Sequence, residues 1–188
     1  MYTYDSLGWI EDQLVKDFEE KNDCELKIVK FSNTGKILAR AKLEKVNPRG
    51  DVIIGLTPTS TEQAKKEDLL EKLGYIENKK NISNKDIIFD KDGFVLPYDF
   101  GALAIIINPE NMKFQPKSFE DITKMKKKLI MQDPRTSTTG QDFLLWTIAA
   151  YGEGWKDFWK KLKPAILTVV PGWSESFAKF ETGEAPMM

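Results

Sequence analysis

The sequence predicts an α/β protein of two lobes, because strand and helix patterns alternate twice along its 188 residues. The first alternation fills the N-terminal half, and a polar stretch, residues 65–90, separates it from the second. The second begins at about residue 118 and runs to about residue 180. Strands that alternate with helices build doubly wound, mostly parallel sheets. Two such layers in series predict two lobes, and folds of this kind bind ligands between lobes and at the carboxyl ends of strands.

The first half carries the patterns of five elements. Apolar residues at helical spacing predict helices, and alternating residues predict a half-exposed strand. A short run of apolar residues is typical of a buried parallel strand. The expected elements are, in order, strand 2–4, helix 10–18, strand 26–31, helix 37–43 and strand 51–55.

The second half starts with two expected strands, residues 94–98 and 103–108, joined through residues 99–101. Ser118 is placed to cap the next helix, with an acidic residue three positions later. The remaining patterns predict helix 119–122, strand 129–132, helices 141–151 and 155–162, strand 166–170 and helix 173–180.

The composition excludes several mechanisms. The chain has 28 basic and 29 acidic residues, a net charge of −1, which indicates no nucleic-acid-binding surface. It has no histidine, which excludes imidazole as a catalytic base or metal ligand. Cys24 is the only cysteine, so no internal disulfide and no zinc cluster is expected. It lies at the expected join of a helix and a strand, where we expect a buried thiol.

No segment of the sequence approaches the ~18 apolar residues that a membrane span needs. The first expected strand follows Met1 directly, so the sequence begins without the pattern of a secretory leader. A secreted protein expressed without its leader has this appearance, and we expect the leader to be missing here.

The segment 133–140 has the strongest pattern for ligand binding. It follows an expected strand, opens an expected helix and contains Thr136, Ser137, Thr138, Thr139 and Gly140. Free backbone N–H groups, hydroxyl donors and the helix dipole together favour an anion at such a helix start. Ordinary capping of the helix by a hydroxyl is the alternative interpretation.

Two further positions suit a flat, positively charged ligand. Trp173 begins a helix just past a strand, where its ring can stack on a ligand or simply cover the local core. Tyr4 and Asp5 place a ring and a carboxylate at a strand end, as Tyr98 and Asp99 do later. Asp5 could instead cap the next helix. Paired carboxylates could also serve acid–base catalysis, but no nucleophile–base pair accompanies them.

Six segments of the chain resemble, in this order, the thiamine-binding subunits of bacterial ABC importers. Residues 132–138 and 172–175 carry most of the resemblance, and the other segments are residues 2–6, 24–27, 51–56 and 97–101. The resemblance covers the chain from Tyr2 to about Glu184. It implies a two-lobed type II periplasmic-binding-protein fold, with lobe one in residues 1–100, lobe two in residues 101–188 and a hinge near residues 99–102.

The resemblance also implies a function and a set of ligand contacts. The protein would capture thiamine or its mono- or diphosphate as transported ligand, outside the cytoplasm, and deliver it to the membrane subunits of an importer. No cofactor, metal or nucleic acid would take part. Ser137 and Thr138 would contact the phosphate, Trp173 would form an aromatic wall, and Tyr4 and Asp5 would lie near the pocket. Asn33 and Thr34 stand where the family usually has Asp-Gly, so the sequence departs from the family there.

The resemblance implies that the family continues beyond Glu184, so we expect the C-terminal region that completes lobe one to be missing from this sequence. We therefore expect an incomplete lobe one and weak binding, and we expect this chain either to self-associate or to be a remnant of a longer chain. A protein of the same fold for iron, a polyamine or another phosphorylated metabolite is the first alternative. A thiaminase-like enzyme is less favoured, because Cys24 is the only thiol and is not expected near the cleft.

Overall fold

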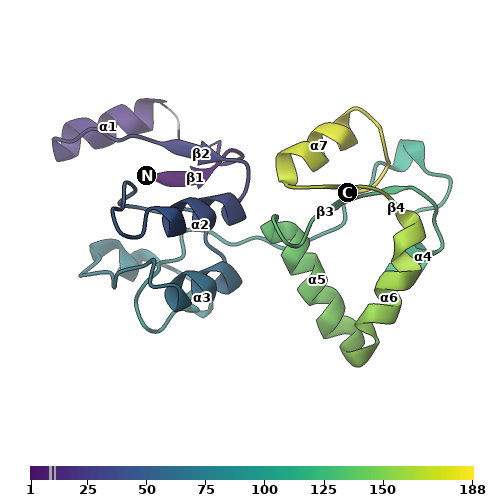
Figure 1. Ribbon diagram of the computed structural model, residues 1–188. Coiled ribbons are helices and arrows are strands. Elements are labelled where there is room, and N and C mark those ends of the chain that lie inside the picture. The colour runs from purple at the N-terminus through teal and green to yellow at the C-terminus, as the bar shows by residue number, and fades with distance from the viewer. Residues whose placement is uncertain (9, 11) are drawn as a thin grey trace. The chain divides into compact units, whose positions relative to one another are not determined.

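The computed structural model describes residues 1–8, 10 and 12–188. The chain forms two compact units (Figure 1). The first unit comprises Met1–Tyr4 and Ile10–Ala102, and the second comprises Asp5–Trp9 and Leu103–Met188. That the units act as the lobes 1–100 and 101–188, with a hinge near residues 99–102, stays a prediction.

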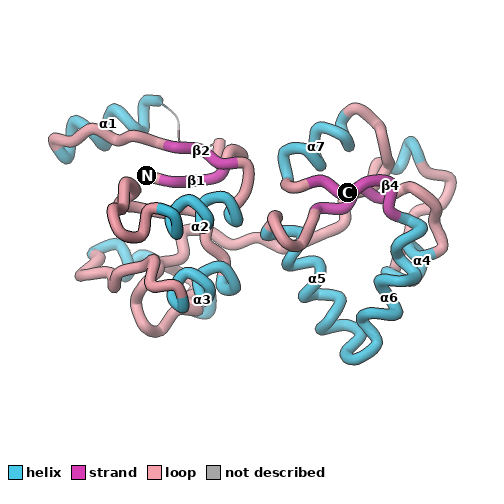
Figure 2. Tube along the Cα trace, viewed as in Figure 1, coloured by secondary structure: helices cyan, strands magenta, loops and turns pink. Residues whose placement is uncertain are grey.

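The first unit has a two-stranded parallel sheet with short helices (Figure 2). Strand β1 pairs with β2 so that Tyr2 lies opposite Val29. Its elements in chain order are β1 (Tyr2–Tyr4), α1 (Asp12–Asn22), β2 (Val29–Phe31), α2 (Thr34–Leu43), α3 (Pro58–Lys66) and the 3-10 segments η1 (Glu77–Asn81) and η2 (Lys85–Ile87). The expected strand 51–55 makes only a single parallel bridge, between Ile53 and Tyr2.

The expected strand 94–98 was wrong, and a buried carboxylate explains why. Residues 94–98, all described by the structure, form no strand. The backbone N–H groups of Phe94 and Val95 donate to Oδ2 of Asp90, at 2.6 and 3.0 Å. Because the Asp90 side chain satisfies these two backbone N–H groups, they do not pair with a neighbouring strand.

The expected strand 103–108 was also wrong, since it is reduced to a single antiparallel bridge between Ile107 and Met187. Ile106 and Met188 exchange two backbone hydrogen bonds, of 2.9 and 3.1 Å, and the Asn108 N–H donates to the Pro186 carbonyl. The 3-10 turn that begins at Pro109 then ends the pairing.

Cys24 is exposed, against the expectation of a buried thiol. It follows α1, a helix whose residues are all described and none of which is buried. Asp23, with φ of 48°, turns the chain out of the helix, and the Cys24 N–H donates to the Glu19 carbonyl at 3.3 Å. The join between α1 and β2 therefore lies at the surface, because the helix before it covers no core.

The second unit is built around a second two-stranded parallel sheet, in which Gln132 lies opposite Val170. Its elements are η3 (Pro109–Asn111), α4 (Phe119–Thr123), β3 (Leu129–Gln132), α5 (Thr138–Tyr151), η4 (Gly152–Gly154), α6 (Trp155–Leu162), η5 (Lys163–Ala165), β4 (Ile166–Val170) and α7 (Trp173–Glu181). These strands and helices confirm the α/β pattern that the sequence predicts.

Alternating side chains of β3 fill two separate cores. Leu129 and Met131 pack with Phe143 of α5 and Phe158 of α6. Ile130 packs with Val170 on the other side, against Phe180 of α7. This is the two-residue period of a strand buried on both faces, and Figure 1 shows α7 on one side of the sheet with α5 and α6 on the other.

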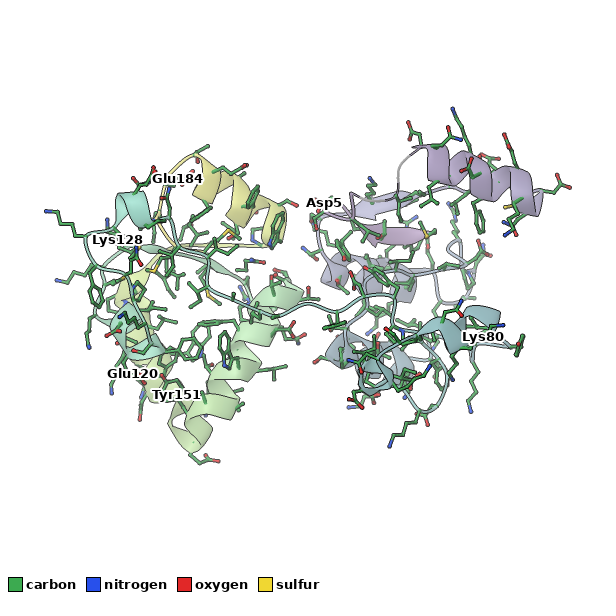
Figure 3. The ribbon with its side chains drawn as sticks, turned by 180° about the vertical axis from the view of Figure 1, so that it is seen from behind. Asp5, Lys80, Glu120, Lys128, Tyr151 and Glu184 are labelled. Carbon is green, nitrogen blue, oxygen red and sulfur yellow. The ribbon has the colours of Figure 1, made fainter. Side chains whose placement is uncertain are left out.

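A hydrogen bond between side chains also links α5 to α4. The Tyr151 hydroxyl, at the end of α5, donates to the Glu120 carboxylate of α4 at 2.5 Å (Figure 3). This hydrogen bond lowers the pKa of Glu120. Burial and the same hydrogen bond raise the pKa of Tyr151 to about 12. Together with the packed rings, this contact fixes α5 relative to the rest of the second unit.

We expect replacement of Asp90 by asparagine to destabilise the chain by about 1–2 kcal/mol, because a buried acceptor loses its charge-assisted partner. The Asp90 carboxylate accepts from the Lys65 ammonium at 3.1 Å and is 7% exposed. Burial raises its pKa, but Lys65 and three backbone N–H groups outweigh burial and hold the pKa below its usual range. Urea unfolding of both proteins measures the difference.

The pH dependence of that difference has a definite sign. A carboxyl whose pKa is lower in the folded state stabilises the fold above the unfolded pKa of about 4. The stabilisation is lost as the pH falls through the folded pKa of Asp90. The gap between the wild-type chain and D90N should therefore be full at neutral pH and shrink below about pH 4. A gap that stays constant down to pH 3 would contradict this assignment.

Candidate functional site

The carboxyl ends of β3 and β4 bring two distant segments of the chain together. The Asp133 N–H donates to the Val170 carbonyl at 2.8 Å, one residue past the end of β3. The Thr136 hydroxyl donates to the Pro171 carbonyl at 2.7 Å. Helices α5 and α7 both begin just beyond these contacts, so their first turns share one edge of the sheet. This is the edge at which α/β folds place their ligands.

The start of α5 is a capped helix end that rests directly on β3. Ser137 is the N-cap, 5% exposed, and its Oγ accepts from the Gly140 N–H at 3.3 Å. A Cβ atom on Gly140 would lie 2.5 Å from the carbonyl oxygen of Gln132, so only glycine allows this approach. Thr138 is partly exposed at the first helical position.

Two of the free donors at this helix start are backbone groups, beside the hydroxyl of Thr138. Within the part of the chain that the structure describes, the N–H groups of Thr138 and Thr139 have no hydrogen-bond acceptor. The neighbouring guanidinium of Arg135 is engaged by Asp133, with an Nε–Oδ1 distance of 2.9 Å. That contact lowers the pKa of Asp133. The helix start therefore offers an anion two N–H donors, the Thr138 hydroxyl and the positive end of the dipole.

Trp173 occupies the first position of α7 and is 39% exposed, which confirms the expected partial exposure. Its ring stacks on Phe177, with centroids 4.8 Å apart and an interplanar angle of 8°. Phe177 therefore covers one face of the indole. That the exposed face lies toward a cleft stays a prediction.

Asp5, labelled in Figure 3, has a partner that the sequence does not indicate. Its Oδ1 accepts a hydrogen bond of 3.0 Å from the Ser174 hydroxyl, 169 residues away. The carboxylate thus lies in the first turn of α7, whose N-cap is Gly172 and supplies no side chain. A negative charge at this end of a helix is favourable, and Asp5 remains exposed to a cationic ligand.

The other expected contacts, Tyr4, Asn33 and Thr34, belong to the first unit, and two of them, Tyr4 and Thr34, lie against Gly55. The Thr34 hydroxyl donates to the Gly55 carbonyl at 3.1 Å. Gly55 has φ of 105°, and a Cβ there would lie 2.2 Å from the Tyr4 ring. The Tyr4 and Tyr98 hydroxyl oxygens are 3.1 Å apart. Burial, first, and the contact with Tyr4 raise the pKa of Tyr98 well above its usual value.

Asn33 and Thr34 are both buried and serve the local fold. Asn33 is the N-cap of α2, and its side chain accepts from the Lys36 N–H at 2.9 Å. With Thr34 tied to Gly55, both side chains have structural partners. Their role as ligand contacts stays a prediction, as it does for Tyr4, Asp5, Ser137, Thr138 and Trp173. The structure brings Asp5, Ser137, Thr138 and Trp173 to one sheet edge, and Tyr4 and Thr34 to Gly55.

Sequence reasoning missed Gln132, Gly55 and Ser174. Gln132 is a polar residue that ends an otherwise apolar strand, and this signal could have found it. An apolar pocket of about 50 Å³ lies beside Gln132. This volume is far smaller than the ~300 Å³ or more of typical ligand sites.

Two further features of the described residues bear on function. Among them, no group of histidine, cysteine, aspartate or glutamate side chains could hold a metal ion. None of the described helices is long and apolar enough to cross a membrane.

Comparison with known proteins gives a consistent set of relatives. The family described as bacterial extracellular solute-binding protein matches residues 13–188. The thiamine-binding periplasmic proteins of Escherichia coli and Brucella abortus are each 34% identical to the chain over 193 residues. The protein of that name from Haemophilus influenzae is 30% identical over 195 residues. All three alignments include the whole of this chain.

Solved structures agree with these relatives. A periplasmic thiamin binding protein superposes with a TM-score of 0.85 and 33% identity, over 99% of this chain and 59% of the other. The periplasmic binding protein AfuA from Actinobacillus pleuropneumoniae, with fructose-6-phosphate bound, has a TM-score of 0.74 at 23% identity and shares the fold. It aligns over 99% of this chain and 60% of its own. The chain spans 57–58% of the length of the curated relatives named above.

Proposed function

Because the chain belongs to the bacterial extracellular solute-binding protein family, we propose that it captures thiamine and its phosphates for an ABC importer. The observation that carries this proposal is the 34% identity, over the whole chain, to thiamine-binding periplasmic proteins. The TM-score of 0.85 to a periplasmic thiamin binding protein supports it. The same relatives support a place outside the cytoplasm.

The second unit offers groups that match the chemistry of this ligand. Thiamine joins an aminopyrimidine to a permanently cationic thiazolium, and its phosphates add an anionic tail. The exposed indole of Trp173 and the carboxylate of Asp5 would attract the cationic ring. The free N–H groups of Thr138 and Thr139 would receive the phosphate at the start of α5.

The proposal makes the protein a carrier rather than a catalyst. Its partners would be the ligand and the membrane subunits of the importer, and it would need no cofactor. Binding would be read by the importer as a change in lobe arrangement, as in other hinged binding proteins. Incubation with thiamine should accordingly release no thiazole. Release of thiazole at a catalytic rate would favour the thiaminase-like alternative.

Titration calorimetry tests the proposal directly. Thiamine, thiamine monophosphate and thiamine diphosphate are titrated in turn into the 188-residue chain. Saturable heat with one equivalent of at least one of them is the expected result. Ferric ion, spermidine and fructose-6-phosphate serve as controls for same-fold ligands. Absence of binding with all three thiamine forms, or tighter binding of a control, would overturn the proposal.

We further propose that the 188-residue chain self-associates in solution. The first unit exposes large apolar side chains, with Leu43, Val46 and Tyr75 exposed by 83%, 100% and 92%. Exposed apolar patches and open sheet edges favour pairing with another chain. Light scattering should give a mass above that of one chain, and the variant V46K should lower it. A single-chain mass at every concentration would contradict the prediction.

A further inference from the structure

Gln132 lies at the centre of a small buried network below the start of α5. It is the last residue of β3 and is 9% exposed. Its Oε1 accepts a hydrogen bond of 2.6 Å from the Ser137 hydroxyl. The Thr139 hydroxyl donates to the same Oε1. The two hydroxyl oxygens are themselves 2.9 Å apart, so three oxygen atoms form a closed triangle.

The number of protons in this triangle decides what the hydroxyls can do. A serine or threonine hydroxyl carries one proton, and an amide oxygen carries none. Three contacts therefore share two protons, and both are used inside the triangle. The Ser137 Oγ also accepts from the Gly140 N–H, which occupies another of its lone pairs. Neither hydroxyl has a proton left for an anion above the helix start.

We propose that Gln132 is a positioning residue that sets the preference of this site between phosphorylated and unphosphorylated ligand. By holding the Ser137 and Thr139 protons inward, it limits the donors for a phosphate to the Thr138 hydroxyl and the N–H groups of Thr138 and Thr139. The site thereby binds the anionic tail less strongly than its sequence of hydroxyls indicates. This inference rests on the proposed function, and it changes the part expected of Ser137 from phosphate donor to helix cap.

The variant Q132M tests the inference, because methionine has a similar length and no amide oxygen. It removes the acceptor Oε1, so one hydroxyl can donate to the other while the second proton turns toward the phosphate. We expect the affinity ratio of thiamine monophosphate to thiamine to rise about tenfold, the change that one added hydrogen bond to a charged group produces. A merely structural role would lower both affinities together. The matched control is Q141M, the same substitution on α5 outside the triangle, which should leave the ratio unchanged.

A double variant and a measurement on the unmodified chain complete the experiment. Adding T139V to Q132M should remove part of the gain in the ratio, since one freed hydroxyl is then absent. In the unmodified chain, proton NMR should show the Thr138 and Thr139 amide protons shifting with thiamine monophosphate. The Thr139 hydroxyl proton should keep its position. This second readout needs no variant to fold.

The outcomes separate this inference from the proposed function. Binding of thiamine by the unmodified chain, with a ratio that falls or stays constant in Q132M, overturns the inference alone. A ligand-induced shift of the Thr139 hydroxyl proton does the same. If the unmodified chain binds none of the thiamine forms, the proposed function fails and the inference fails with it.

Discussion

Replacing Phe158 by alanine should lower the free energy of unfolding by about 3–5 kcal/mol, the range for removal of a buried phenylalanine. Phe158 is 5% exposed and stacks on Tyr151, with centroids 4.6 Å apart and an angle of 13°. Its ring centroid lies 5.7 Å from that of Phe119. The substitution thus removes a ring at which α4, α5 and α6 meet and leaves a cavity below β3. Denaturant unfolding followed by tryptophan fluorescence measures the loss.

The control for F158A lies one turn along the same helix. Lys161 is exposed on α6, and K161A should change stability by no more than about 0.5 kcal/mol. F158A should also weaken any binding at the start of α5, because that helix rests on the same core. A loss below about 1 kcal/mol in F158A would mean that α6 is not packed against β3 as described.

The elements of the second unit could be predicted because local pattern and tertiary packing agree there. Strands 129–132 and 166–170 lie where the apolar runs predict them. The Ser118 hydroxyl accepts from the Asp121 N–H at 3.1 Å, which confirms the expected cap. Helix α5 begins at Thr138, three residues before the expected start, because Ser137 caps it and Gly140 lets its first turn approach β3.

The wrong expectations share a cause in contacts that sequence pattern does not record. The strand-like residues 94–98 give two of their N–H groups to the Asp90 side chain. Cys24 follows a helix that is amphipathic by pattern, yet none of that helix's residues, all described, is buried. A pattern predicts which face of an element is apolar, but burial also needs another element to cover that face.

In the candidate site, too, some features have a local sequence signal and others depend on tertiary contacts. Hydroxyls and a glycine at a helix start are a local signal, and the structure places Ser137 and Thr138 there. The partner of Asp5 is Ser174, 169 residues away, and no local pattern links the two. The hydrogen bond from the Ser137 hydroxyl to Gln132 depends on how closely the first turn of α5 packs against β3. Sequence therefore indicates which groups gather at the sheet edge, and packing decides which of their protons remain free.

Replacing Trp173 by alanine should weaken thiamine binding about 5- to 150-fold, which corresponds to ~1–3 kcal/mol for a lost stacking or cation–π contact. The indole is 39% exposed and has one face against Phe177, and the proposal needs its other face to receive the ligand. W173F, which keeps a smaller flat ring, should lose less.

Trp146 is the matched control, since it is 42% exposed and lies in the middle of α5, away from the helix start. Calorimetry on W173A and W146A, after circular dichroism has shown both to be folded, should reveal a loss in W173A alone. Equal affinities in the two variants would make Trp173 a packing residue and remove the aromatic wall from the proposed site.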